Sequence, residues 1–145
     1  MRKILLPATI LFFLLILNTE NIFACSCVLP VGNLSLKKQV ENSYKTASAV
    51  FSAEVIEISQ QPNVYNVIIK LKVSKSWKRI NSQEIILTTG RGGGDCGYRF
   101  EIGKKYLVYA YGERNDLGTG ICSRTDLLKN NKDIKVLDKL KKKKT

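Results

Sequence analysis

Hydrophobic positions near the start of the soluble sequence recur at near-helical spacing. Leu34, Leu36, Val40, Tyr44 and Ala47 follow this spacing, and charged or polar residues lie between them. This is the pattern of an amphipathic helix. It predicts a short helix over about residues 34–46, with Asn33 or Ser35 as its N-cap.

The middle of the chain instead predicts strands. Between Val67 and Val73, β-branched or aliphatic residues alternate with Ile68, Lys70 and Lys72, which indicates one buried and one exposed face. The Gln-Pro-Asn at 61–63 and the Asn-Ser at 81–82 are typical of turns. The segments rich in β-branched and aromatic residues are 49–58, 64–77, 84–89, 98–100 leading into 105–111, and 118–122.

A second helix is predicted from Asn131 to about Leu140, because Ile134, Leu137 and Leu140 share one helical face and Asn131 can cap its start. About five strands with a helix at either end predict a mainly β fold. The uneven strand lengths favour a five-stranded Greek-key barrel of the OB type with flanking short helices. Periodicity alone leaves a β-sandwich open as the alternative.

The first 24 residues do not follow the pattern of the domain. A basic start precedes an apolar run from Ile4 to Leu17 that only Pro7 and Thr9 interrupt. Ala24 is a small residue, as expected before a cleavage point. This layout predicts a secretory signal peptide at 1–24. The run is too short for a bilayer span of roughly 20 residues. A lipoprotein signal, with an acyl chain on Cys25, is the other alternative, and both leave the chain exported to the envelope or medium.

Charge gathers at the C-terminal end of the chain. The net charge is +12, and residues 129–145 hold eight lysines and two aspartates. We therefore divide the exported chain into a domain at 25–128 and a basic helix and tail at 129–145. The tail predicts attraction to an anionic lipid or surface polymer, with a solvated end that aids solubility as the alternative.

The chain contains no histidine, which excludes Ser-His and Cys-His couples and histidine-ligated metal sites. No paired acids or activated nucleophile stand out, and Glu54 with Glu57 is typical of an exposed strand edge. We therefore expect no enzyme activity, no cofactor and no intrinsic metal. Nucleic-acid binding would need stacking aromatics on a basic groove. The candidate aromatics are typical of core positions in strands: Tyr65, Trp77, Tyr98, Tyr106, Tyr109 and Tyr111.

The four cysteines all follow the predicted leader, at positions 25, 27, 96 and 122. An even count in an exported chain predicts disulfides. A bond between Cys25 and Cys27 would close a strained small ring, so each is expected to pair with a distant cysteine, and two pairings remain. A four-thiolate zinc site is the weaker alternative, because its usual spacing is two Cys-x-x-Cys pairs.

The glycine-rich sequence R91-G-G-G-D-C-G97 is not a phosphate cradle, since no Lys-Ser/Thr pair and no helix follow it. We expect a tightly folded loop around Cys96.

The start C25-S-C-V-L-P30 resembles the N-terminus of the tissue inhibitors of metalloproteinases. The segments V73-S-K-S-W-K78, C96-G-Y-R-F-E-I-G-K-K-Y-L-V-Y-A110 and G120-I-C-S-R-T-D-L127 are similar to bacterial members of that netrin-like superfamily. The resemblance covers residues 25–128. It implies an OB-fold barrel with the pairs Cys25–Cys96 and Cys27–Cys122.

The resemblance also implies a function, since the first cysteine of the animal inhibitors chelates the catalytic zinc of a metalloprotease through its α-amino nitrogen and carbonyl oxygen. Cys25 would be this chelator, Ser26 would point into the specificity pocket, and Cys27 and Val28 would continue as a substrate-like strand. Gly94, Asp95 and Cys96 would form an adjacent ridge. We expect a secreted monomer whose partner is a zinc metalloprotease.

The chain departs from the animal pattern in three ways. It lacks a third disulfide within the barrel and a cysteine-rich second domain, and its Leu29 and 31–34 region differ from the animal sequences. A non-inhibitory binding module of the cell surface, using the barrel face or the basic tail, is therefore the alternative function.

Overall fold

The computed structural model describes residues 25–27, 32–62, 64–92, 94–113, 115–129 and 131–142. The predicted leader at 1–24 and Val28 lie outside these residues. Among the described residues, no helix is both long and apolar enough to cross a membrane.

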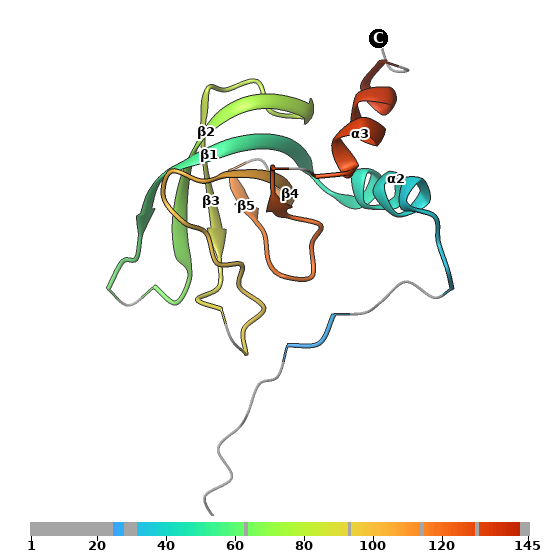
Figure 1. Cartoon of the computed structure of the whole chain (residues 1–145). Helices are drawn as coiled ribbons and strands as arrows, with labels where there is room; N and C mark the ends of the chain where they lie inside the picture. The colour runs from blue at the N-terminus through green and yellow to red at the C-terminus, as the bar shows by residue number, and fades with distance from the viewer. Residues whose placement is uncertain are drawn as a thin grey trace, which may run out of the picture.

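Five strands close into a barrel, as predicted (Figure 1). Their order is β1-β2-β3-β5-β4, and β4 pairs back onto β1 to complete the circle. The β3–β5 contact is parallel and the other pairings are antiparallel. This is the mainly β Greek-key arrangement of an OB fold. The strands are β1 Ala49–Ser59, β2 Val67–Lys78, β3 Glu84–Thr89, β4 Lys105–Glu113 and β5 Asp116–Gly118, and β6 Asp126–Leu127 adds a short edge beside β4.

Bulges curve the longest pair of strands. The register between β1 and β2 shifts at three places along their length. Each shift inserts an unpaired residue that bends and twists the pair, which lets two long strands follow the wall of a small barrel.

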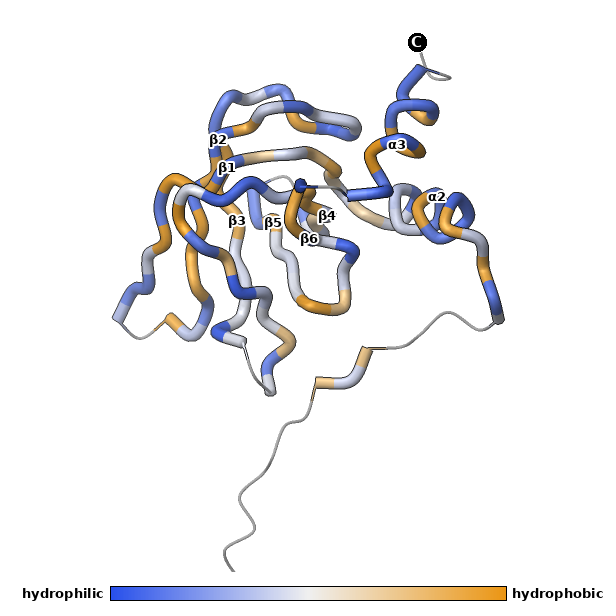
Figure 2. Tube along the Cα trace, in the orientation of Figure 1, coloured by the Kyte–Doolittle hydropathy of each residue, from blue (hydrophilic) through white to orange (hydrophobic). Residues whose placement is uncertain are grey.

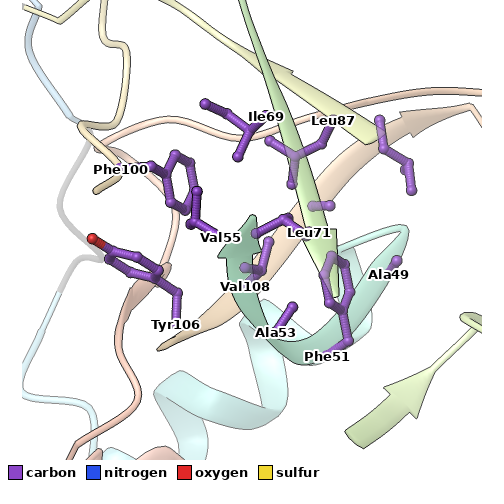
Figure 3. Packing of buried hydrophobic residues seen from close by; sticks show 12 residues of the cluster. Ala49, Phe51, Ala53, Val55, Ile69, Leu71, Leu87, Phe100, Tyr106 and Val108 are labelled. Atoms are coloured by element: carbon purple, nitrogen blue, oxygen red, sulfur yellow. The ribbon is translucent and has the colours of Figure 1, made fainter. Parts of the chain in front are cut away.

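The barrel interior is the first hydrophobic core. Alternate residues of β1 and β4 point inward, among them Phe51, Val55 and Val108, and none of these three is exposed (Figure 3). The predicted alternation along β2 is confirmed, since Ile69 and Leu71 point into the same core. Phe100 and Tyr106 pack edge to face at one end, with ring centroids 4.9 Å apart.

Two helices cover the outside of the barrel and create a second core. They are α2 Leu36–Thr46 and α3 Asp133–Lys142, and both lie on the same side of the barrel (Figure 1). Hydrophobic and hydrophilic residues alternate around both helices (Figure 2). The side chains of β4 that point out of the barrel meet the helices here, so β4 is buried on both faces. The core consists of Val40, Tyr44, Ala47, Val50, Trp77, Leu107, Tyr109 and Leu137.

A predicted capping residue stands before each helix, although both helices begin two residues later than predicted. Ser35 caps α2, because its hydroxyl accepts a hydrogen bond from Lys38 N. Asn131 Oδ1 accepts a hydrogen bond from Asp133 N at the start of α3. Each cap satisfies a backbone donor that the first helical turn leaves unpaired.

Two predicted strands are wrong. Residues 98–100 are irregular, although Phe100 is buried in the barrel. The last barrel strand covers 116–118 rather than 118–122, and the chain turns at 121–124. Of the aromatic residues considered for stacking, Trp77, Tyr106 and Tyr109 are buried, whereas Tyr65 and Tyr111 are exposed.

Candidate functional site

Two disulfides fix the segment Cys25–Cys27 to the barrel. Cys25 is bonded to Cys96 and Cys27 to Cys122, across 71 and 95 positions of sequence, which confirms the pairing implied by the resemblance. The bonds lie side by side, because the Sγ atoms of Cys25 and Cys122 are 3.8 Å apart. Both ends of this three-residue segment are thereby attached to two neighbouring loops.

All four cysteines are oxidised, so none offers a thiolate to a metal. The three sulfurs of Cys25, Cys96 and Cys122 lie within 4.8 Å of one another because the two disulfides are adjacent. Two disulfides indicate an oxidising, extracellular type of compartment.

Asp95 organises the loop that carries Cys96. Its carboxylate accepts hydrogen bonds from the backbone nitrogens of Arg91 at 2.6 Å, Gly92 at 2.9 Å and Gly97 at 2.9 Å. The bond from Gly97 and the other backbone donors lower the pKa of Asp95. The glycine-rich sequence is therefore a tightly folded loop, as predicted, with one charged acceptor at its centre.

Cys96 itself lies in the left-handed region of backbone conformation, with φ of 61°. Its carbonyl oxygen accepts a hydrogen bond of 2.9 Å from Ile121 N, so the loop of Cys96 and the loop of Cys122 are joined. The neighbouring Gly97 packs directly on Gly90, and a Cβ at Gly97 would lie 2.2 Å from the Gly90 backbone. This close approach requires glycine.

Arg91 connects the same loop to the turn between β1 and β2. Its Nε donates to the carbonyl oxygen of Tyr65 at 2.9 Å, and the guanidinium lies 5.1 Å from the centroid of the Tyr65 ring. The hydrogen bond between Tyr65 and Asp95 raises the pKa of the phenol. This contact is not predictable from the sequence pattern. Tyr65 was expected in the strand segment 64–77 and Arg91 in a loop, so nothing in the sequence brought the two together.

Hydroxyl groups brace the loop that carries Cys122. Thr119 Oγ1 donates to the carbonyl oxygen of Tyr109 at 3.0 Å and lies 2.8 Å from Thr125 Oγ1. Thr125 Oγ1 in turn accepts a hydrogen bond from Tyr109 N at 3.0 Å. Ser123 Oγ donates to the carbonyl oxygen of Gly120 at 2.8 Å and closes the turn.

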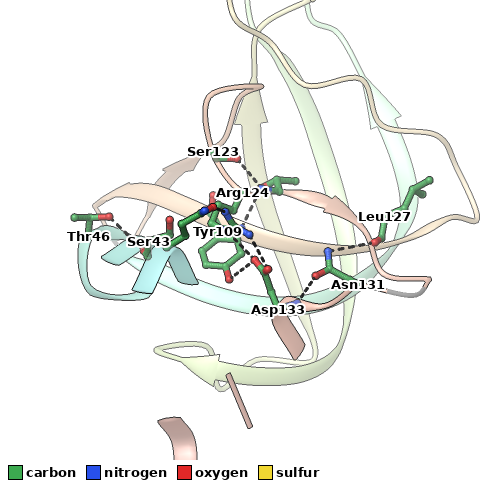
Figure 4. Close-up of polar contacts among 10 residues, drawn as sticks. Ser43, Thr46, Tyr109, Ser123, Arg124, Leu127, Asn131 and Asp133 are labelled. Atoms are coloured by element: carbon green, nitrogen blue, oxygen red, sulfur yellow. Dashed lines mark hydrogen bonds and ion pairs between the residues drawn. The ribbon is translucent and has the colours of Figure 1, made fainter. Parts of the chain in front are cut away.

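Arg124 then ties this loop to both helices, and Figure 4 shows its contact with Asp133. It binds Asp133 of α3 through two hydrogen bonds of 2.7 Å and donates to Gln39 of α2 at 3.0 Å. The hydroxyl of Tyr109 also donates to Asp133, at 3.0 Å. The Asp133 carboxylate raises the pKa of Arg124, and burial raises the pKa of Tyr109. The guanidinium is a planar fork that suits such bidentate pairing.

The predicted site residues that the structure describes come together at one edge of the barrel. Ser26, Cys27 and Gly94 are exposed there, and Cys25, Asp95 and Cys96 are partly exposed. Open depressions flank the disulfides, one lined by Cys27 and Ile121 and the other by Cys96 and Thr119. We call the exposed segment and the loop beside it, residues 25–27 and 94–96, the N-terminal ridge.

No family model matches the chain, and no curated protein matches its sequence.

Proposed function

We propose that the chain is an exported inhibitor of zinc metalloproteases and acts through Cys25. Cleavage after Ala24 would give Cys25 a free α-amino group beside its carbonyl oxygen. Both groups are good ligands for a zinc ion that keeps one coordination position open for water. The amine lone pair would replace that water on the protease, and the carbonyl oxygen would complete a chelate.

The observation that carries the proposal is the double attachment of the segment. Chain ends normally fray, but disulfides hold Cys25 and Cys27, and the exposed Ser26 lies between them. A segment that is already ordered loses little conformational entropy when it enters a cleft. The resemblance of C25-S-C-V-L-P30 to the tissue inhibitors of metalloproteinases supports the same function.

The surroundings of the segment also suit an inhibitor. Asp95 and the Cys96–Ile121 hydrogen bond fix the two loops that carry the disulfide partners. Ser26 would face the specificity pocket, where its hydroxyl can meet the general-base carboxylate of the protease. Gly94 and Asp95 would lie beside it along the rim of the cleft.

The test compares two products that differ only in where one alanine is added. In the first, alanine is inserted between Ala24 and Cys25; in the second, it follows Thr145. Both are isolated after export of the full chain, and intact mass must show a start at the intended residue with two disulfides. Inhibition constants are then measured against the catalytic domain of a matrix metalloproteinase with a quenched peptide substrate.

We expect the product with alanine after Thr145 to inhibit and the product with alanine before Cys25 not to, because the extension replaces the amine by an amide nitrogen that has no basic lone pair. Equal inhibition by both products would refute chelation by Cys25. Absence of inhibition by a correctly processed product against a panel of zinc proteases would refute the proposed function.

A further inference from the structure

A row of lysines lies along the solvent side of α3. Lys135, Lys139 and Lys142 follow the spacing of one helical face and are all exposed, whereas Leu137 on the opposite face is fully buried. We call these three residues the lysine row. Successive members lie one turn apart, so the charges form a line rather than a scattered distribution.

The helix that carries the row is fixed firmly to the domain. Leu137 packs into the second core, and Asp133 pairs with Arg124 at the start of the helix. Asp138 accepts hydrogen bonds from Trp77 Nε1 at 2.6 Å and from Lys75 Nζ at 2.7 Å. The row is therefore presented on a rigid surface rather than on a loose tail.

The carboxylates of the two helices are already paired with other cations. Within the described residues, no ion pair involves Lys135, Lys139 or Lys142. The row therefore keeps a positive potential that an anionic partner can neutralise. The existing pairs are Glu41 with Lys37, Asp138 with Lys75, and Asp133 with Arg124.

An apolar slot runs beside the row, between α2 and α3. Val136 and Leu140 line it, and Lys37, Glu41 and Lys139 complete its walls. Val136 and Leu140 are partly exposed, so the slot is open to an apolar group from outside. A surface that presents a row of cations beside an apolar slot matches the headgroup region of an anionic bilayer, which offers phosphates above and acyl carbon below.

We propose that the α2–α3 face attaches the protein to the surface of anionic phospholipid bilayers. The lysine row binds phosphates, and the long lysine side chains lie along the surface while the slot takes up apolar contact. A soluble acidic polymer would satisfy the charges but leave the slot empty, which favours the lipid. Figure 1 shows α3, which carries the lysine row, well away from the segment 25–27.

The test measures sedimentation of the exported, leader-free product with vesicles. One set of vesicles is phosphatidylcholine, and the other is an equal mixture of phosphatidylcholine and phosphatidylglycerol. The test variant is Lys135→Gln/Lys139→Gln/Lys142→Gln. The matched control removes three exposed cations from the barrel: Lys72→Gln/Arg99→Gln/Lys104→Gln.

We expect the wild type to bind the mixed vesicles and not the phosphatidylcholine vesicles. Each lysine near an anionic surface contributes about fivefold to affinity, so the test variant should bind roughly 100-fold more weakly. The control should stay closer to the wild type than the test variant does. Thermal unfolding must show both variants folded, which is expected because all six positions are on the surface.

Two results would overturn the proposal. One is equal loss of binding by the test and control variants, which would mean that net charge and not this face determines attachment. The other is binding of the wild type to polyglutamate in solution together with no sedimentation with the mixed vesicles. That result would identify an acidic polymer as the ligand. Neither result depends on protease inhibition, so the two proposals fail separately.

Discussion

Either disulfide, removed alone, should cost about the same free energy of unfolding, although the two bonds span 71 and 95 positions. The variants are Cys25→Ser/Cys96→Ser and Cys27→Ser/Cys122→Ser. In each, the remaining bond already joins the chain end to the barrel. The lost bond therefore closed only a smaller ring, in which the two disulfides join segment 25–27 to segment 96–122. This ring spans about 28 positions whichever bond is removed.

Chain entropy for a ring of this size gives a cost of about 3.5 kcal/mol for either variant, against about 4.5 kcal/mol for a lone bond across 71 or 95 positions. In a domain of this length, about 3.5 kcal/mol lowers the midpoint of thermal unfolding by roughly 10–15 °C. Removing both bonds adds the cost of a lone bond and brings the loss to about 8 kcal/mol, comparable to the whole stability of a typical domain.

Urea unfolding followed by tryptophan fluorescence provides the assay. Trp77 is the chain's single tryptophan and is only 5% exposed, so its fluorescence reports on the second core. Costs that differ between the two variants by more than about 1 kcal/mol would refute the ring argument. They would show that local contacts of one bond, rather than chain closure, determine its contribution.

Three further predictions concern charge and packing. Inhibition should strengthen as the pH rises towards the pKa of the Cys25 α-amino group, about 7.7–8.0, because only the neutral amine binds zinc. Inhibition constants that do not change between about pH 6 and 9 would contradict this prediction. The depressed pKa of Asp95 stabilises the fold above the unfolded pKa of about 3.9, and this contribution is lost as pH falls through the folded pKa. Asp95→Asn should therefore lower the midpoint of thermal unfolding at neutral pH and make that midpoint fall less steeply as the pH is lowered. If the midpoint of the variant falls with pH as steeply as that of the wild type, Asp95 does not contribute to acid unfolding. Leu137 is fully buried between α3 and the barrel, so Leu137→Ala should cost about 2–5 kcal/mol in urea unfolding, while a cost below about 1 kcal/mol would mean that α3 is not part of the cooperative unit.

The sequence predicted the elements whose side chains alternate between core and solvent. The strand at 84–89 has the predicted bounds, and the helix predicted at 34–46 begins two residues later, where Ser35 caps it. The strand predicted at 118–122 failed because Ser123 bonds back to the carbonyl oxygen of Gly120 through both its hydroxyl and its backbone nitrogen, which folds this stretch into a turn. Hydrophobic composition alone does not reveal such local competition.

The candidate site was predictable only in part. Cysteine count and position predicted two long-range disulfides, but the choice between two pairings came from the resemblance. Asp95 was expected in the ridge, yet its three backbone hydrogen bonds form only in the folded loop, where Cys96 adopts a left-handed conformation. The contact of Arg91 with Tyr65 joins loops 26 residues apart, and only the closed barrel brings them together.

The second core also determines when the domain can finish folding. It brings α2 against α3 as well as against the barrel, so residues 36–46 complete their packing only when residues 133–142 are present. The closing pair β1–β4 likewise joins the early and late parts of the chain. A polypeptide with this wiring can make its last native contacts only when nearly all of it is available.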